Sequence, residues 1–225
     1  MKLNCILFSI CLIFSVSVLG QDAVQSSDKE AAYTRTITTR AEKIVATLGV
    51  TDPSQEKKLV SIIAVQYRNL NAIYTERDEQ TKAVKQKEQS KDAAESELKK
   101  IEQATNQKIA ALHTTFLSSL SSILSAEQVI KVKDGMTYNV VTVTYDAYVD
   151  MIPTLKNEQK QQIMAWLVEA REYAMDAESS EKKHSWFGKY KGRINNYLSK
   201  EGYDINEERK EWEKRKATAK QSTTN

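Results

Sequence analysis

The sequence has 225 residues, with 33 Lys and Arg against 30 Asp and Glu and a formal net charge of +3. This near balance gives no electrostatic footprint for nucleic-acid binding, and the length is enough for one domain with a sizeable core. Only two prolines and six glycines, with 28% charged residues, favour helices over a β-sandwich or barrel.

The first twenty residues are typical of a signal peptide. Lys2 supplies the positive start, residues 6–19 form the apolar run, and Gly20 is a small residue at the expected cleavage point. The run is about 14 residues, short of the roughly 20 that span a bilayer, so a retained anchor is the less favoured alternative and we expect no stable membrane insertion after cleavage. Both cysteines, Cys5 and Cys11, lie inside this segment. The mature chain therefore has no thiol, disulfide or lipid-bearing cysteine, and we expect a periplasmic or secreted protein.

Helical periodicity dominates the remaining sequence. Residues 21–28 predict a flexible leader, residues 29–216 a single helical domain, and residues 217–225 a disordered tail. The apolar spacing predicts a helix over residues 29–48, a second over 53–85 and, after a turn at 89–92, a third that ends at about residue 123. Further helices are predicted over 126–134, 145–151, 157–178, 180–202 and 207–216. Capping signals support two starts: Asp52 before Pro53 with Gln55 three residues later, and Ser125 with Gln128.

The fold class predicted is all-α, a multi-helix bundle with a long projecting antiparallel helical hairpin. The hairpin joins residues 53–85 to the return helix, and its arm, about 74–105, is almost wholly charged or polar. One β-branched run interrupts the helical pattern at residues 136–144, MTYNVVTVT. We interpret it as an extended crossing segment, with a lone strand as the alternative, because the chain offers no partner strand.

Aromatic, basic and amide side chains concentrate in residues 180–203, SEKKHSWFGKYKGRINNYLSKEGY. At 100° per residue, Phe187, Ile194 and Leu198 share the expected core face. One flank carries Trp186, Tyr190, Arg193 and Tyr197, and the other carries His184, Lys191 and Asn195. Gly188 and Gly192 leave a bare side, which predicts close approach of another backbone or of a ligand.

This mixture of side chains fits the recognition of sugars. Aromatic faces stack on the C–H faces of a sugar ring, while Arg and Asn bind its hydroxyls in fixed geometry. The candidate ligand-binding residues are Trp186, Tyr190, Arg193, Asn196, His184, Tyr138, Tyr145 and Trp166. The alternative is that the aromatics are core anchors and the basic residues a solvated rim.

Motifs for metal, cofactor or covalent chemistry are missing from the sequence. The two histidines, His113 and His184, are far apart, and no zinc spacing, phosphate loop or G-x-S-x-G elbow occurs. We therefore predict no cofactor, no metal and no catalytic residue, and interpret His113, beside Leu112 and Phe116, as structural. Carboxylate pairs form only in space, and the candidate acids near aromatics are Asp146, Asp150, Glu169 and Glu172.

Three blocks of the sequence resemble a known family: residues 134–138 (DGMTY), 165–172 (AWLVEARE) and 189–198 (KYKGRINNYL). The chain is similar to a secreted family of unknown function from Bacteroidota, domain of unknown function 3826, with a suggested role in sugar binding. The likeness runs from about Ala41 to Trp212. It implies a periplasmic protein found alongside polysaccharide-degradation genes and brings no catalytic or ligand residues. Lys156 departs from the Thr expected before its helix.

Four functional hypotheses follow. The first is a secreted or periplasmic carbohydrate-binding or polysaccharide-utilisation accessory protein, whose partner is an oligo- or polysaccharide. The second is a helical periplasmic chaperone or stress protein, and the third an interaction module that forms a homodimer through the hairpin. An enzymatic alternative is a polysaccharide lyase using His184, Tyr190, Arg193 and Asn195, but these do not share one helix face.

Overall fold

The computed structural model describes residues 18–87 and 90–222, and within these ranges it contains eight helices and no strand. The predicted all-α class is confirmed. The helices are α1 (Val18–Val45), α2 (Pro53–Gln86), α3 (Lys91–Ser121), α4 (Ala126–Met136), α5 (Val140–Met151), α6 (Asn157–Met175), α7 (Ser180–Lys200) and α8 (Ile205–Ser222). No helix in the described ranges combines the length and apolarity needed to cross a bilayer.

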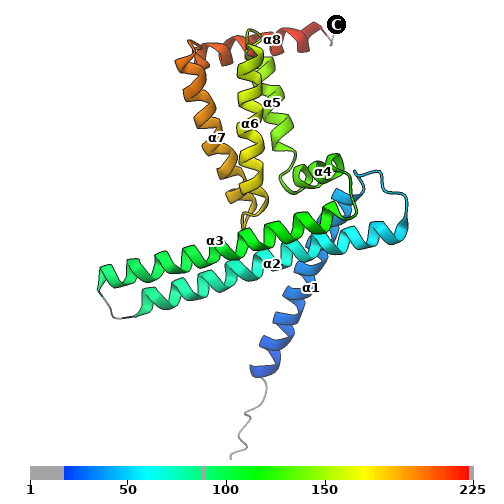
Figure 1. Cartoon of the computed structure of the whole chain (residues 1–225), viewed down its shortest axis with the longest axis vertical. Coiled ribbons are helices and arrows are strands. Elements are labelled where there is room, and N and C mark those ends of the chain that lie inside the picture. Colours follow the sequence, from blue (N-terminus) through cyan, green and yellow to red (C-terminus); the bar gives the residue numbers. More distant parts are fainter. Residues whose placement is uncertain (1–17, 88–89, 223–225) are drawn as a thin grey trace, which may run out of the picture.

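The molecule has two parts set at a steep angle. The α2–α3 hairpin lies crosswise with α1 packed across it, while α6 and α7 stand upright on it with α5 beside α6, and α8 caps their far end (Figure 1). Each part has its own hydrophobic core. Buried residues of α1–α4, such as Ile37, Leu59 and Leu120, form the first core, and Ile163, Leu167 and Phe187 belong to the second. Met175, the last residue of α6, inserts into the first core and links the two parts.

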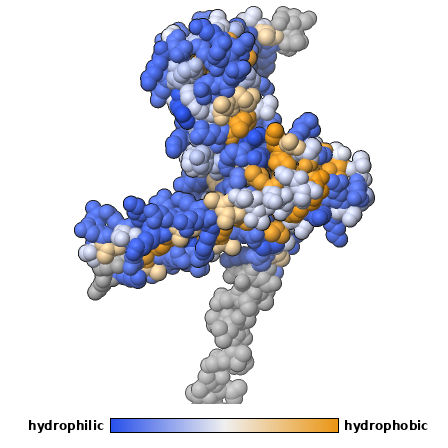
Figure 2. Space-filling model, viewed as in Figure 1, coloured by the Kyte–Doolittle hydropathy of each residue, from blue (hydrophilic) through white to orange (hydrophobic). Residues whose placement is uncertain are grey.

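The projecting hairpin is confirmed. Between residues 74 and 105, the buried side chains that α2 and α3 contribute are those of Val84 and Thr105. Figure 2 shows the corresponding hydrophilic surface, with apolar residues on that face gathered instead where α4 meets the base of the hairpin. The long charged helices therefore stay solvated toward the tip, as their composition indicates.

Local capping chemistry fixes several helix starts. Asp52 precedes Pro53 and its carboxylate accepts from the backbone N–H groups of Ser54 and Gln55 at 3.1 and 3.2 Å. The expected capping role of Gln55 is wrong, because its amide donates to the Ile123 carbonyl at 3.2 Å and joins the hairpin ends instead. The Ser125–Gln128 capping box is present in both directions.

The interpretation of residues 136–144 as an extended segment is wrong. Helix α4 continues to Met136, Tyr138 and Asn139 turn the chain with positive φ angles of 59° and 56°, and α5 begins at Val140. The preference of β-branched residues for strands is worth at most about 1 kcal/mol and depends on context. Burial of Val141 in the second core outweighs it.

The two chain ends are helical where the structure describes them. Residues 21–28, expected to be a flexible leader, lie within α1, and α8 extends the predicted last helix through the first residues of the expected disordered tail to Ser222. Most of the predicted signal peptide, residues 1–17, lies outside the described residues, as do residues 223–225.

Gly135 lies inside α4 rather than after its end, for a steric reason. A Cβ at this position would lie 2.8 Å from Cγ1 of the buried Ile44 on α1. We expect Gly135→Ala to destabilise the fold by about 1–3 kcal/mol through overpacking, despite the roughly 1 kcal/mol that Ala contributes to a helix interior. Urea unfolding followed by circular dichroism measures this change.

The matched control is Gly188→Ala in α7. A Cβ at Gly188 or Gly192 meets no atom within 4 Å, so the expected close approach of another backbone to this bare side does not occur. Gly188→Ala should therefore stabilise the protein by about 0.5–1 kcal/mol. Equal signs for the two substitutions would contradict the steric role assigned to Gly135.

Candidate functional site

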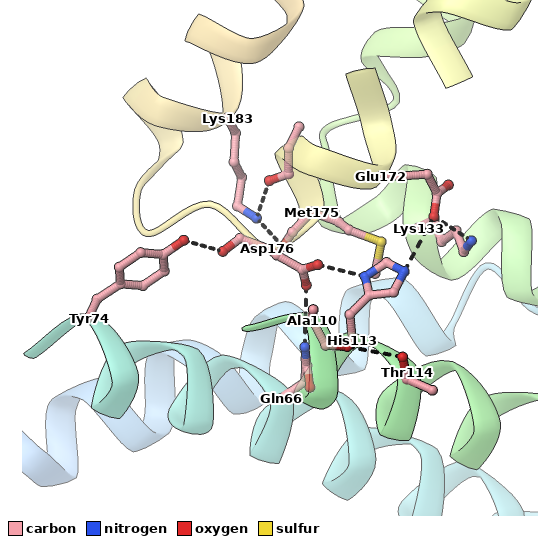
Figure 3. Close-up of polar contacts among 11 residues, drawn as sticks. Gln66, Tyr74, Ala110, His113, Thr114, Lys133, Glu172, Met175, Asp176 and Lys183 are labelled. Carbon is pink, nitrogen blue, oxygen red and sulfur yellow. Dashed lines mark hydrogen bonds and ion pairs between the residues drawn. The ribbon is translucent and has the colours of Figure 1, made fainter. Parts of the chain in front are cut away.

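The C-terminal end of α6 meets the hairpin through one buried carboxylate. The Asp176 side chain accepts hydrogen bonds from Nδ1 of His113 at 2.6 Å and Nε2 of Gln66 at 3.4 Å. The Tyr74 hydroxyl donates to the Asp176 carbonyl oxygen at 2.9 Å. Figure 3 shows side chains of α2 and α3 converging on this residue. Asp176 therefore holds both hairpin helices against the upright bundle.

A second set of charges lies on the other side of the His113 ring. Nε2 of His113 is 3.7 Å from a Glu172 carboxylate oxygen, which also pairs with the Lys133 ammonium at 2.7 Å. Arg171 bridges Asp134 at 2.8 Å and Glu172 at 3.5 Å. Carboxylates and cations are thus closely matched at this junction, and it carries little net charge.

Lys183 connects α7 to the C-terminal end of α6, next to Asp176. Its ammonium donates to the Ala174 and Met175 carbonyls at 3.0 and 2.7 Å, in the last turn of α6 (Figure 3). Burial lowers the pKa of Lys183 to about 8, and the Asp176 charge opposes that shift. The lysine therefore helps to fix the position of Asp176.

A pocket of about 580 Å³ opens beside this network, between α2, α3, α6 and α7. We call it the junction pocket. It is lined by Tyr74, Asn106, Ile109, Ala110, His113, Thr114, Glu172, Tyr173, Asp176 and Trp186. The rings of Tyr173 and Trp186 stack with centroids 4.6 Å apart and planes 17° from parallel. Tyr173 is 49% exposed, so this aromatic pair borders solvent.

The junction pocket combines an aromatic surface with both donors and acceptors. Burial raises the pKa of Tyr74 to about 12, with Glu178 and Asp176 adding to the shift, so its hydroxyl stays a neutral donor. The hydrogen bond to Asp176 raises the pKa of His113, which extends the doubly donating imidazolium form to higher pH. Such a lining suits a polar, uncharged ligand with one apolar face.

A second pocket of about 550 Å³ follows the contact between α6 and α7, and we call it the seam pocket. Its lining comprises Trp166, Lys189, Gly192, Arg193, Asn196, Tyr197 and Lys200. The Arg193 guanidinium lies over the Trp166 ring at 4.5 Å, and the Tyr197 ring meets the Trp166 ring edge-on at 5.3 Å. Aromatic and cationic groups are therefore combined here.

The structure separates the residues that the sequence predicts as ligand-binding. Trp186 lines the junction pocket, while Arg193, Asn196 and Trp166 line the seam pocket. The rings of His184 and Tyr138 stack on each other, with centroids 5.5 Å apart. The two remaining phenols pack against the second core: Tyr190, only 6% exposed, is part of it, and Tyr145 lies at its edge. Tyr190 therefore occupies the position that the core-anchor alternative describes, because its ring packs between α6 and α7.

The residues of the lyase hypothesis do not converge either. Asn195 accepts a hydrogen bond from the Tyr148 hydroxyl at 2.6 Å, on the opposite side of α7 from Arg193, and borders a third pocket with Lys191 and Trp212. Among the candidate acids, Asp150 accepts from the Trp212 indole N–H at 2.5 Å and Glu169 pairs with Arg193 at 3.4 Å. Only Glu172 reaches the junction pocket. Within the described residues, no group of three or more His, Cys, Asp and Glu side chains is placed to hold a metal ion.

The sequence alone does not predict the residues at the centre of the junction pocket. Its patterns indicate a structural role for His113 and do not identify Tyr74, Tyr173 or Asp176 as candidate site residues. One signal was available: Glu172 and Asp176 lie four residues apart and therefore on one face of α6. The partner of that face could not be found, because His113 is 63 positions away along the chain.

The chain matches the sequence profile of one known protein family over most of its length. The sequence profile of a family described as a protein of unknown function, DUF3826, matches residues 34–218. The chain belongs to this family. The match covers both hydrophobic cores, the hairpin and both pockets, so the DUF3826 domain comprises both parts of the fold. No curated protein matches the sequence.

The His113–Asp176 pair gives this DUF3826 domain a specific pH dependence. The pKa of His113 is raised above its ordinary value of 6.5 in the folded protein, so the stability that protonation contributes is fully present below about pH 6.5. It is lost as pH rises through the folded pKa. We therefore expect His113→Gln to destabilise the fold more at about pH 6 than at about pH 9.

Urea unfolding of the wild type and of His113→Gln at both pH values measures this difference. Titration of Lys183 occurs in both proteins and cancels in the comparison. His184→Gln is the control, because that ring stacks on the exposed Tyr138. A destabilisation by His113→Gln that is the same at both pH values would contradict the charged pairing with Asp176.

Proposed function

We propose that this DUF3826 protein binds a carbohydrate in the junction pocket. The observation that carries the proposal is the stacked Tyr173–Trp186 pair, which borders solvent within the same pocket as the His113, Glu172 and Asp176 side chains. An aromatic surface next to fixed donors and acceptors matches the two faces of a sugar ring, one of C–H groups and one of hydroxyls.

The charge and size of the pocket support this ligand class. Carboxylates and cations around Glu172 and Asp176 are paired with each other, so neither an anion nor a cation gains a large net attraction. Hydroxyl groups can both donate to the carboxylates and accept from the Asn106 amide. A volume of about 580 Å³ lies within the range of small-molecule sites and accommodates a mono- or disaccharide unit.

The proposed role is that of an exported accessory protein for polysaccharide use, which binds a glycan. The signal-peptide pattern of residues 1–20 supports export. The junction pocket supports recognition through preformed contacts, since Gln66, Tyr74 and Lys183 hold Asp176 in place before a ligand arrives.

A glycan array with the purified protein tests this proposal. We expect binding to a defined set of linear oligosaccharides, followed by calorimetric titration with the best of them. Because Trp186 lines the pocket, bound sugar should also change tryptophan fluorescence, and that change should be smaller in Trp186→Phe. An array without any signal, repeated by calorimetry at millimolar oligosaccharide, would overturn the proposal.

A further inference from the structure

The junction pocket and the seam pocket lie on one line along the α6–α7 pair. Going up the two helices from the hairpin, Tyr173 faces Trp186, then Glu169 faces Arg193, then Trp166 faces Arg193 and Tyr197. On α7, the residues Trp186, Lys189, Arg193 and Tyr197 are three or four positions apart, so they lie along one face of the helix. Lys189 connects the pockets, since it lines the seam pocket while its ammonium lies 5.0 Å from the Trp186 ring centroid.

The two pockets differ in charge. The lining of the seam pocket includes the cations Lys189, Arg193 and Lys200 and no carboxylate. Glu169 reaches Arg193 from the rim at 3.4 Å, which is longer than a strong charge-assisted hydrogen bond, and both side chains are about half exposed. Glu158 and Glu201 approach Tyr197 at the far end. The excess of positive charge is therefore at Lys189 and Arg193, next to the Trp166 ring.

Arg193 is arranged for a planar anion. Its guanidinium lies over the Trp166 indole at 4.5 Å and within 5.9 Å of the Tyr190 ring centroid. A guanidinium over an aromatic ring keeps its N–H edge accessible, and the N–H groups of Arg193 other than the Nη1 contact with Glu169 can bind a carboxylate through two parallel hydrogen bonds. Gly192 keeps the adjoining helix surface open, with no atom within 4 Å of where a Cβ would lie.

We propose that the seam pocket is a second subsite of the same binding surface, specific for a carboxylate-bearing sugar, so that the ligand is a linear acidic oligosaccharide. The inference rests on the proposed function of the junction pocket and extends it. An α-helix rises about 1.5 Å per residue, so Trp186 and Arg193 are about 10 Å apart along α7, and Trp186 and Tyr197 about 16 Å. A chain of about three or four pyranose rings covers this length.

Matched tetrasaccharides test the proposal by calorimetry. The probes are linear oligomers that alternate a neutral hexose with galacturonate, glucuronate or mannuronate, each as the free acid and as the neutral methyl ester, together with the corresponding disaccharides. We expect at least one free acid to bind about tenfold more tightly than its ester and its disaccharide. The preference for the acid should shrink as salt rises from about 0.05 to about 0.5 M, because exposed charges are screened.

Variants assign the preference to Arg193. Arg193→Gln should bind acid and ester equally, and Arg193→Lys should keep only part of the preference because the ammonium loses the planar double contact. Lys191→Gln removes the same charge from the other flank of α7, outside the seam pocket, and should leave the preference unchanged. Circular dichroism confirms that each variant is folded.

The outcomes separate this inference from the proposed function. Equal affinity for acid and ester in the wild type overturns the acidic subsite and leaves carbohydrate binding standing. If neither form binds but the glycan array shows binding of a neutral oligosaccharide, the acidic subsite is likewise overturned and carbohydrate binding stands. A preference for the acid that persists in Arg193→Gln also overturns it. If the array shows no binding either, both proposals are overturned.

Discussion

Replacing Trp186 by alanine is expected to weaken carbohydrate binding by about 10- to 100-fold. The indole forms one half of the stacked pair that borders the junction pocket, with Tyr173 as the other half. Removing it exposes a sugar face that would otherwise be buried, and burial of a large aromatic side chain is worth about 1.5–3 kcal/mol. Calorimetry with the best oligosaccharide from the array measures the dissociation constant.

The control for this substitution is Trp212→Ala. Trp212 lies on α8, packs against the second core and donates its indole N–H to Asp150, away from the junction pocket. It should cost thermal stability and leave the affinity within about twofold of the wild type. A Trp186→Ala protein that is folded and binds as tightly as the wild type would show that the sugar does not occupy the junction pocket.

Asp176→Ala is expected to destabilise the protein by about 2–4 kcal/mol. The carboxylate is 7% exposed and accepts from both His113 and Gln66, so its removal leaves two buried or half-buried donors without their acceptor. The junction joins two separate hydrophobic cores. We therefore also expect the two parts to unfold in separate transitions, with a broader urea curve than in the wild type.

A neighbouring ion pair supplies the control for Asp176. Glu178 pairs with Arg77 across the same boundary, but the two side chains are 25% and 28% exposed. Glu178→Ala should cost less than about 1 kcal/mol, as exposed pairs do. Urea unfolding followed by both tryptophan fluorescence and circular dichroism distinguishes the cases. Similar small losses for the two variants would refute the role of Asp176 as the junction's main polar contact.

Local signals in the sequence predicted the helices well where neighbouring residues set the free energy. Asp52 before Pro53 and Ser125 with Gln128 start α2 and α4, because capping uses side chains within three residues of the backbone they satisfy. Local propensity gave a wrong prediction at residues 136–144, where an extended segment was expected. There the β-branched side chains favour a strand, while contacts of Val141 and Tyr148 with distant helices favour α5.

The candidate site was only partly predictable. The aromatic and basic flank of α7 predicted Trp186 and Arg193 as ligand-binding residues, and each of them lines a pocket. Helical spacing could not distinguish Tyr190, on the same flank but buried, from its more exposed neighbours, because burial depends on how closely α6 packs there. His113 looked structural for a similar reason, since the residues that surround it come from other helices.

By itself, the sequence determined the all-α class, the long hairpin and the core face of α7, since periodicity and capping act over a few residues. The tertiary structure alone decided where the junction pocket lies. Asp176 meets His113, Tyr74 and Gln66 across 63, 102 and 110 positions of sequence. These contacts exist only because the upright bundle docks on the hairpin, and no local free-energy term encodes that docking.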